Sequence, residues 1–307
     1  MPFVLDDKDS GQINRARQVS RESLTFATKR VELLPNREGI MYRRTLLSTS
    51  ITAGIVGAFF VIRPFQPTVQ GQDMRIETEV YSGNARQPVF ENITLFSDTS
   101  VYDFSRTGPE KITVYDRRTG RFVLLNVASR TKVILEQNTV DEYVEILKKR
   151  ESLTKKEPFL FNPKFDETYN EATKQITLSS DQMTYKIKGT PSKSKESFDA
   201  YIDFANGYSK LSATDPRQMP PFARLEVNKA ISNREIIPQE VERVYKPSNG
   251  VFGSAIKAKT KHFVVWTLSR KDRQRIDQAL DYVTEFKEVS LPEYYGIAKS
   301  QSPTLAR

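Results

Sequence analysis

Residues 111–136, KITVYDRRTGRFVLLNVASRTKVILE, carry the clearest fold signal in the chain. Two apolar, β-branched runs, Lys111–Tyr115 and Arg121–Val127, flank a turn-rich segment that ends at Gly120. Glycine readily takes the positive φ angle that a tight turn needs, so the pattern predicts a β-hairpin. A further run, Lys132–Glu136, follows a short polar break and extends the hairpin into a meander.

Period-two patterns recur on both sides of this stretch, as expected for strands with one buried face. Met74–Tyr81 alternates apolar and polar residues, and Ile93–Phe96 with Val101–Phe104 predicts another hairpin. Later strands are predicted at Phe165–Asn170, Gln175–Leu178, Met183–Lys188, Phe198–Phe204, Tyr208–Ala213, Phe222–Asn228, Ile236–Val244 and Phe263–Leu268.

Two segments carry the 3.6-residue spacing of amphipathic helices. One covers residues 139–150, and the other opens at Ser269 with the apolar stripe Ile276, Leu280, Val283 and Phe286. Strands joined by hairpins predict an α+β fold. Its centre is a large curved antiparallel sheet, an open or incomplete β-barrel, with the two main helices packed on one face.

An export segment is predicted at Leu46–Ile62, LLSTSITAGIVGAFFVI, which contains no charged residue. Seventeen residues at about 1.5 Å each give a helix of about 26 Å, at the lower edge of what spans a bilayer. Arg43 and Arg44 precede the run, and Val69 and Gly71 occupy the −3 and −1 positions of a signal-peptidase site. We therefore predict a signal peptide cleaved after Gly71. The paired arginines also resemble a twin-arginine signal.

The chain thus divides into four segments. Residues 1–40 are predicted to be a disordered or mis-called N-terminal extension, 41–71 a signal peptide or membrane anchor, 72–298 an exported α+β domain, and 299–307 a frayed tail. In the alternative, residues 1–40 are a cytoplasmic tail and residues 46–62 stay in the inner membrane. Basic residues before the apolar run place the body outside the cytoplasm in both cases, in the periplasm or cell envelope.

The composition excludes several classes of site. The chain has no cysteine and one histidine, which excludes disulfides, thiolate metal sites, a cysteine nucleophile and multi-histidine metal centres. It also lacks the glycine-rich phosphate-binding motifs, the serine hydrolase elbow and the HExxH motif. We assign no catalytic, cofactor-binding or metal-ligating residue, expect no cofactor, and predict that the protein is not an enzyme.

The isolated polar residues are not assigned to a catalytic or metal site. His262 has no nearby acid in the sequence and is interpreted as a surface or strand-end histidine. Asp199 and Asp203, four residues apart on a predicted strand, would lie about 13 Å apart, too far to share a proton or one metal ion.

The net charge of +9 raises the question of a polyanionic partner. Acidic residues interrupt the basic runs, and an exported protein rarely meets nucleic acid, so nucleic-acid binding is not expected. A basic surface is predicted at Arg270, Lys271, Arg273 and Arg275, suited to anionic headgroups, wall polymers or an envelope protein partner.

Eight aromatic residues in predicted strands are candidates for core filling or for the lining of an apolar cavity between sheet and helix. They are Phe96, Tyr102, Phe104, Tyr115, Phe122, Tyr185, Phe198 and Phe204.

This arrangement resembles the periplasmic lipoprotein-carrier family. The strand–turn–strand from Ile112 to Leu125 and the run Phe222–Val227 carry the resemblance, which covers Gln72 to about Val244. It implies an incomplete β-barrel with a helical lid over an apolar cavity that accepts acyl chains. The chain departs from that pattern by adding Lys257–Ala298, and no family site residue is carried over.

Three functions follow as expectations. The first is a non-catalytic envelope protein that binds an apolar ligand, such as a lipid or acyl chain, or a lipidated partner in a sheet–helix cavity. The second is a structural or adaptor protein with a filled core and a basic binding surface. The third is a carboxylate-based hydrolase of envelope polymer, which would need two acids about 5–9 Å apart in a cleft.

Overall fold

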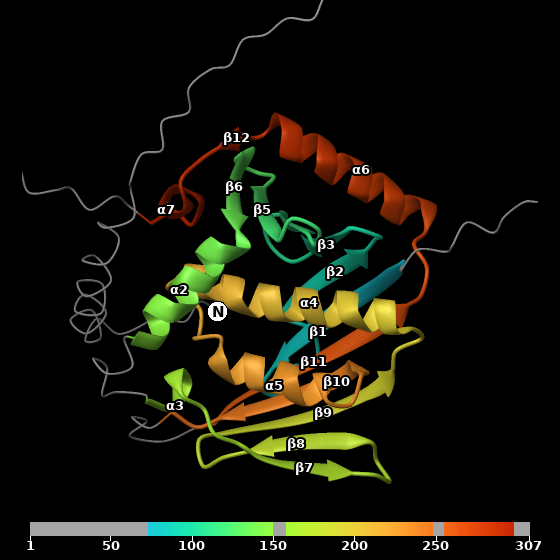
Figure 1. The fold of residues 1–307 in the computed structure, drawn as a ribbon, viewed down its shortest axis with the longest axis vertical. Coiled ribbons are helices and arrows are strands. Elements are labelled where there is room, and N and C mark those ends of the chain that lie inside the picture. Colours follow the sequence, from blue (N-terminus) through green and yellow to red (C-terminus); the bar gives the residue numbers. More distant parts are fainter. Residues whose placement is uncertain (1–72, 150–157, 248–254, 298–307) are drawn as a thin grey trace, which may run out of the picture. The chain divides into compact units, whose positions relative to one another are not determined.

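The computed structural model describes residues 73–149, 158–247 and 255–297, and its centre is one open, twelve-stranded sheet (Figure 1). The strand order is β12-β6-β5-β4-β3-β2-β1-β11-β10-β9-β8-β7, and the two edge strands do not pair with each other. The strands are β1 Met74–Ser82, β2 Phe90–Phe96, β3 Ser100–Ser105, β4 Lys111–Asp116, β5 Arg121–Asn126, β6 Thr131–Glu136, β7 Asp166–Asn170, β8 Gln175–Ser179, β9 Met183–Pro191, β10 Ile236–Tyr245, β11 Ile256–Val265 and β12 Lys287–Glu288.

Two antiparallel meanders make up this sheet. Strands β1 to β6 form the first and β7 to β11 the second, and pairing of β1 with β11 joins them at the centre. The predicted hairpin at residues 111–126 is β4–β5, and Gly120 has the expected positive φ of 66°. One pairing departs from the antiparallel prediction, because β12 runs parallel to β6. The α+β class and the large open sheet are confirmed, whereas the sheet is mixed.

Six α-helices lie in the described ranges, more than the two that were predicted. They are α2 Gln137–Lys149, α3 Pro158–Phe161, α4 Lys195–Leu211, α5 Phe222–Ser232, α6 Arg270–Glu285 and α7 Leu291–Tyr294, with a 3-10 turn, η2, at Ser212–Thr214. Helix α2 begins at Gln137, two residues before the predicted start.

Helices cover both faces of the sheet, which corrects the prediction of a single helical face. Helices α2, α4 and α5 pack on one face, and Figure 1 shows α4 and α5 crossing over the strands. Helix α6 packs on the opposite face over β2–β5. Strand β5 shows why two layers are needed: Phe122 and Leu124 face α4, while Val123 and Leu125 face α6. Because successive side chains alternate between faces, four consecutive buried residues require cover on both sides.

Three predicted strands, at 198–204, 208–213 and 222–228, are helical. The buried residues Phe198, Tyr201 and Phe204 recur every three positions, the spacing of one helix face. The same stretch also alternates apolar and polar residues, which is why the period-two interpretation was wrong. Ser194 caps α4 by accepting a hydrogen bond from the Ser197 amide. Phe222–Val227, which carried part of the family resemblance, forms most of α5.

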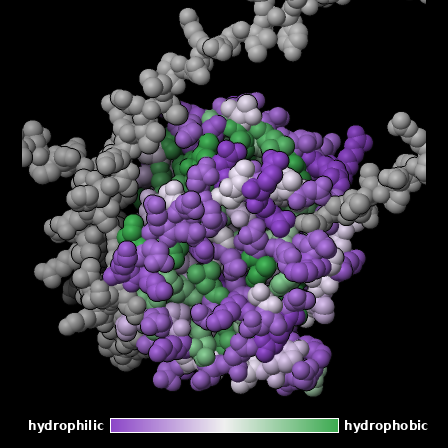
Figure 2. All heavy atoms as spheres, in the orientation of Figure 1, coloured by the Kyte–Doolittle hydropathy of each residue, from purple (hydrophilic) through white to green (hydrophobic). Residues whose placement is uncertain are grey.

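Helix α6 begins as predicted at Ser269. Its hydroxyl accepts a hydrogen bond from the Asp272 amide, and the Asp272 carboxylate accepts one from the Ser269 amide, a reciprocal capping box. Three residues of the predicted apolar stripe, Ile276, Val283 and Phe286, pack against the sheet as expected. The fourth, Leu280, is 46% exposed, and Ala279 takes the buried position beside it. The face seen in Figure 2 is mostly hydrophilic, with apolar patches that hydrophilic side chains separate.

Candidate ligand-binding pocket

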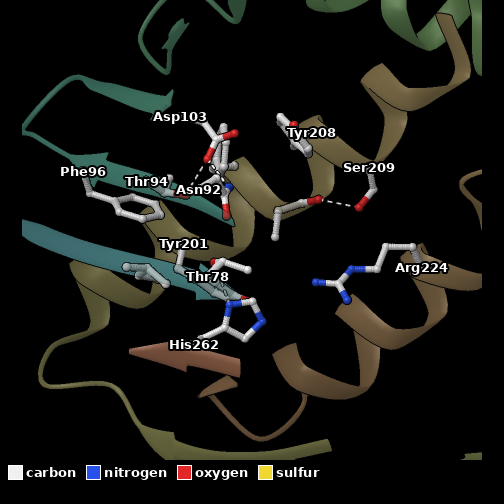
Figure 3. Close-up of a pocket in the computed structure, with 13 residues that line it drawn as sticks. Thr78, Asn92, Thr94, Phe96, Asp103, Tyr201, Tyr208, Ser209, Arg224 and His262 are labelled. Carbon is white, nitrogen blue, oxygen red and sulfur yellow. Dashed lines mark hydrogen bonds between the residues drawn. The ribbon is translucent and has the colours of Figure 1, made fainter. Parts of the chain in front are cut away.

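A pocket of about 150 Å³ lies between the centre of the sheet and helices α4 and α5 (Figure 3). Strands β1, β2, β3 and β11 form its floor. Its lining consists of Ile76, Thr78, Asn92, Thr94, Phe96, Asp103, Tyr201, Phe204, Ala205, Tyr208, Ser209, Arg224 and His262.

Strand register brings the polar floor residues together. Thr78 pairs directly with His262 on β11 and with Asn92 on β2, and in the neighbouring row Thr94 pairs with Asp103. Directly paired residues of an antiparallel sheet point to the same face, so all five side chains face α4. His262 and Asp103 are three strands apart, about 14 Å at about 4.8 Å per strand, and therefore cannot form a hydrogen-bonded catalytic pair.

One end of the pocket contains a buried carboxyl group. Asp103 is only 5% exposed, and it accepts hydrogen bonds from Thr94 Oγ1 at 2.7 Å and from Asn92 Nδ2 at 2.5 Å. Burial raises the pKa of Asp103 to about 6, although these hydrogen bonds oppose the shift. The negative charge of Asp103 in turn raises the pKa of the Tyr208 hydroxyl, with burial as the second cause.

The other end contains His262 and Arg224. Thr78 Oγ1 lies 3.0 Å from His262 Nδ1, while Nε2 is buried and has no hydrogen-bond partner within the described residues. Burial, followed by the positive charge of Arg224, lowers the pKa of His262 to about 3, so the imidazole is neutral at physiological pH. Arg224 lies in the first turn of α5, and among the described residues its half-buried side chain has no hydrogen-bond or ion-pair partner.

Aromatic side chains form the wall between the two ends. The ring of Phe96 meets that of Phe204 edge-on, with centroids 5.9 Å apart, and lies 6.5 Å from that of Tyr201. Figure 3 shows Asp103 and Tyr208 on one side, with His262 and Arg224 across the pocket from Asp103. The pocket therefore offers an apolar surface with a carboxyl group at one end and a cation beside a neutral imidazole at the other.

Only Phe96 and Phe204 of the eight predicted cavity residues line this pocket. The core on the α4 side also contains Tyr115, Phe122, Tyr185 and Phe198. The remaining two, Tyr102 and Phe104, lie on the opposite face in the core under α6, so the eight do not share one cavity. Side chains alternate between the two faces along a strand. Tyr102 and Phe104 flank Asp103, which points to the α4 face, so both of them point to the α6 face.

The four basic residues proposed as a surface lie in the first turns of α6. Arg270 and Lys271 are exposed. Arg273 forms an ion pair with Asp73, and Arg275 forms one with the buried Asp272. The four cations therefore share this region, but two of them are engaged by acids.

The two predicted acids of α4 also have partners. Because the segment is helical, Asp199 and Asp203 are one turn apart instead of about 13 Å. Asp199 pairs with Lys195, and Asp203 contacts Arg117 and Tyr115.

The export segment 46–62 and the cleavage position Gly71 lie outside the described residues. Within the described ranges, no helix combines the length and apolar character that crossing a bilayer requires. In the same ranges, no group of three or more His, Asp or Glu side chains is placed to hold a metal ion.

No known protein-family model matches the chain, and no curated protein matches its sequence.

Sequence reasoning missed His262, Asp103 and Arg224 as parts of one site. His262 is not at a strand end or on the surface, since its strand is central and its Nε2 is buried. One signal was present in the sequence: Asp103 stands between apolar neighbours in a strand that is otherwise buried. A lone acid in such a strand needs hydrogen-bond partners, and these are supplied by the neighbouring strand.

Proposed function

We propose that the protein is an exported, non-catalytic envelope protein that binds a small ligand between its sheet and helices α4 and α5. The observation that carries the proposal is a set of polar groups without partners among the described residues, beside an aromatic wall: His262 Nε2, the Arg224 guanidinium and Asn92 Oδ1. Buried polar groups are normally hydrogen-bonded, so groups without partners in a pocket favour a ligand that completes them.

Pocket size limits the ligand. A cavity of about 150 Å³ holds a molecule the size of benzene, and typical pockets for larger ligands measure about 300–1,000 Å³. A ring-sized ligand therefore suits this pocket better than a long acyl chain. The binding of lipid, or of a lipidated partner, stays a prediction that would require helices α4 and α5 to move away from the sheet.

The same pocket lining supports the non-catalytic part of the proposal. A carboxylate hydrolase needs two carboxyl groups in one cleft, and the residues around this pocket include one, Asp103. The envelope location rests on the export signal at residues 41–71, and an uncleaved signal would give membrane contact through residues 46–62.

Binding can be tested with the full chain and a library of small aromatic and aliphatic fragments. His262 is the chain's only histidine, so its imidazole NMR signals report on the pocket without further assignment. We expect some fragments to shift these signals in a saturable manner and to raise the melting temperature. A library that leaves both the imidazole signals and the melting temperature unchanged would contradict the proposed function.

A second candidate, an adaptor with a filled core and a basic surface, is favoured by Arg270 and Lys271. Both are exposed in the first turn of α6, and neither has an ion-pair partner among the described residues. Exposed cations attract anionic surfaces at roughly 1 kcal/mol for each residue.

For this candidate we expect the full chain to co-sediment with vesicles that contain phosphatidylglycerol more than with neutral phosphatidylcholine vesicles. The double variant Arg270→Gln with Lys271→Gln should lose about 30-fold in binding to the anionic vesicles. Lys174→Gln with Lys193→Gln removes the same charge from other exposed positions and is the control. Equal losses in the two double variants would argue against a specific surface on α6.

A further inference from the structure

We infer that the pocket recognises a small organic monocarboxylate, held by the Arg224 guanidinium and the His262 Nε2–H group, with its apolar body against Phe96, Tyr201 and Phe204. The inference rests on the proposed binding function and specifies the class of ligand.

Arg224 provides the first argument. A buried cation is normally paired, and two half-buried arginines near the sheet have acid partners: Arg75 pairs with Asp272, and Arg117 with Asp203. Arg224 lines the pocket and has no such partner within the described residues. The planar guanidinium fork fits the two oxygens of a carboxylate, so a bound carboxylate would supply the missing negative charge.

His262 provides the second argument. When the Thr78 hydroxyl donates to Nδ1, the imidazole hydrogen is on Nε2, the ring atom that has no partner. Burial, and then the nearby positive charge of Arg224, lowers the pKa of His262 and keeps the ring neutral. Nε2–H is then a hydrogen-bond donor beside a cation, and an anionic acceptor satisfies both groups at once.

The rest of the lining limits the ligand to one carboxylate, with no second anionic group. The titratable groups that line the pocket are Asp103, Tyr201, Tyr208, Arg224 and His262. Asp103 is largely ionised at neutral pH and would repel a second anionic group. The aromatic side chains Phe96, Tyr201 and Phe204 offer an apolar surface that inorganic anions cannot use.

The test uses the full chain with benzoate, its neutral isostere benzamide, and inorganic phosphate, measured by calorimetry and by the His262 imidazole signals. We expect benzoate to bind about 10- to 100-fold more tightly than benzamide, because hydrogen bonds to a charged group are the strong ones. At neutral pH benzoate is ionised, and its carboxylate should move the His262 Nε2–H signal as it accepts the hydrogen bond. Benzamide should move this signal less.

Arg224→Gln removes the cation and is expected to reduce benzoate affinity about 10- to 100-fold while leaving benzamide affinity unchanged. Lys229→Gln is the matched control, because Lys229 is exposed on the same helix and does not line the pocket. Its benzoate affinity should equal that of the unmodified chain. Arg224→Gln should still bind benzamide as tightly as the unmodified chain, a result that a general loss of structure would not allow.

The outcomes separate the carboxylate inference from the binding function on which it rests. If benzoate and benzamide bind equally and Arg224→Gln changes neither affinity, the inference is overturned and the binding function stands. Tighter binding of phosphate than of benzoate would also overturn the inference, because it would indicate an inorganic anion site. If no compound, including the fragment library, perturbs His262, the binding function itself fails.

Discussion

Replacing Phe122 with alanine is expected to lower the free energy of unfolding by about 3–5 kcal/mol, the usual cost of removing a fully buried phenylalanine. Phe122 has no exposed surface, and its ring stacks on Tyr115 with centroids 4.4 Å apart. It also fits against helix α4 at Gly207, where a Cβ atom would lie 2.8 Å from Phe122 Cζ. With neighbours on both sides, the truncated side chain leaves a cavity that the structure refills only in part. Urea unfolding of the full chain, followed by circular dichroism, measures this effect.

This variant also distinguishes a filled core from an acyl-chain cavity. Phe263→Ala is the matched control, because Phe263 is 49% exposed on the sheet face away from α4 and should cost less than about 1 kcal/mol. A filled core predicts a large difference between the two variants. If Phe122→Ala instead costs about as little as Phe263→Ala and increases the binding of an apolar dye, Phe122 lines an adaptable cavity and the lipid-binding prediction gains support.

Local patterns predicted the first meander correctly because its strands follow one another through short turns. The hairpin β4–β5 depends on alternation within a few residues and on Gly120, all readable from the sequence. The start of α6 is equally local, because Ser269 and Asp272 cap each other within one turn, and the helix was predicted to open at Ser269.

Helices α4 and α5 were missed because tertiary packing settled an ambiguous pattern. Residues 198–204 satisfy both a period of two and a helical spacing, and a short apolar segment cannot distinguish them by periodicity alone. The strand preference of Phe198, Tyr201 and Phe204 favoured the wrong choice. Burial of this face against β2 and β5 is a property of the whole fold and is not encoded in the segment.

The pocket depends on contacts between residues that are distant in the sequence. Thr78 and His262 are 184 positions apart, and their pairing exists only because β11 returns to the centre of the sheet beside β1. Sequence patterns suggest which residues face inward along one strand, but they do not specify which strands are neighbours. The sequence suggested an apolar cavity between sheet and helix, but the two helices over this pocket were predicted as strands, and its polar ends were not predicted.

Acid should destabilise the folded protein through His262, by about 3 kcal/mol between pH 6.5 and pH 4. The ordinary pKa of the imidazole is 6.5, and in the folded protein it is lowered to about 3. Between these values the unfolded chain takes up a proton that the folded chain does not, so stability falls by about 1.4 kcal/mol for each pH unit of acidification. Stability from this group is fully present above pH 6.5.

Asp103 has the opposite dependence and conceals this effect in the unmodified chain. Burial raises its pKa to about 6 from an ordinary value of 3.8, so the folded chain binds the extra proton between these values. Acidification from pH 6 to pH 4 therefore adds about 2 kcal/mol of stability from Asp103. Because the two ends of the pocket contribute similar amounts with opposite signs, their sum changes little across this range.

Two variants separate the contributions. His262→Gln keeps a polar group near Thr78 but cannot become charged, so it should gain about 3 kcal/mol at pH 4, relative to pH 7, compared with the unmodified chain. Asp103→Asn retains an oxygen for the Thr94 and Asn92 hydrogen bonds and should lose about 2 kcal/mol in the same comparison. Urea unfolding at both pH values gives these differences, and the double variant should match the unmodified chain. The contradicting outcome is a His262→Gln variant with the same pH profile as the unmodified chain. The His262 imidazole would then take up its proton in the folded protein as readily as in water. In that case the buried position of His262 beside a cation is wrong.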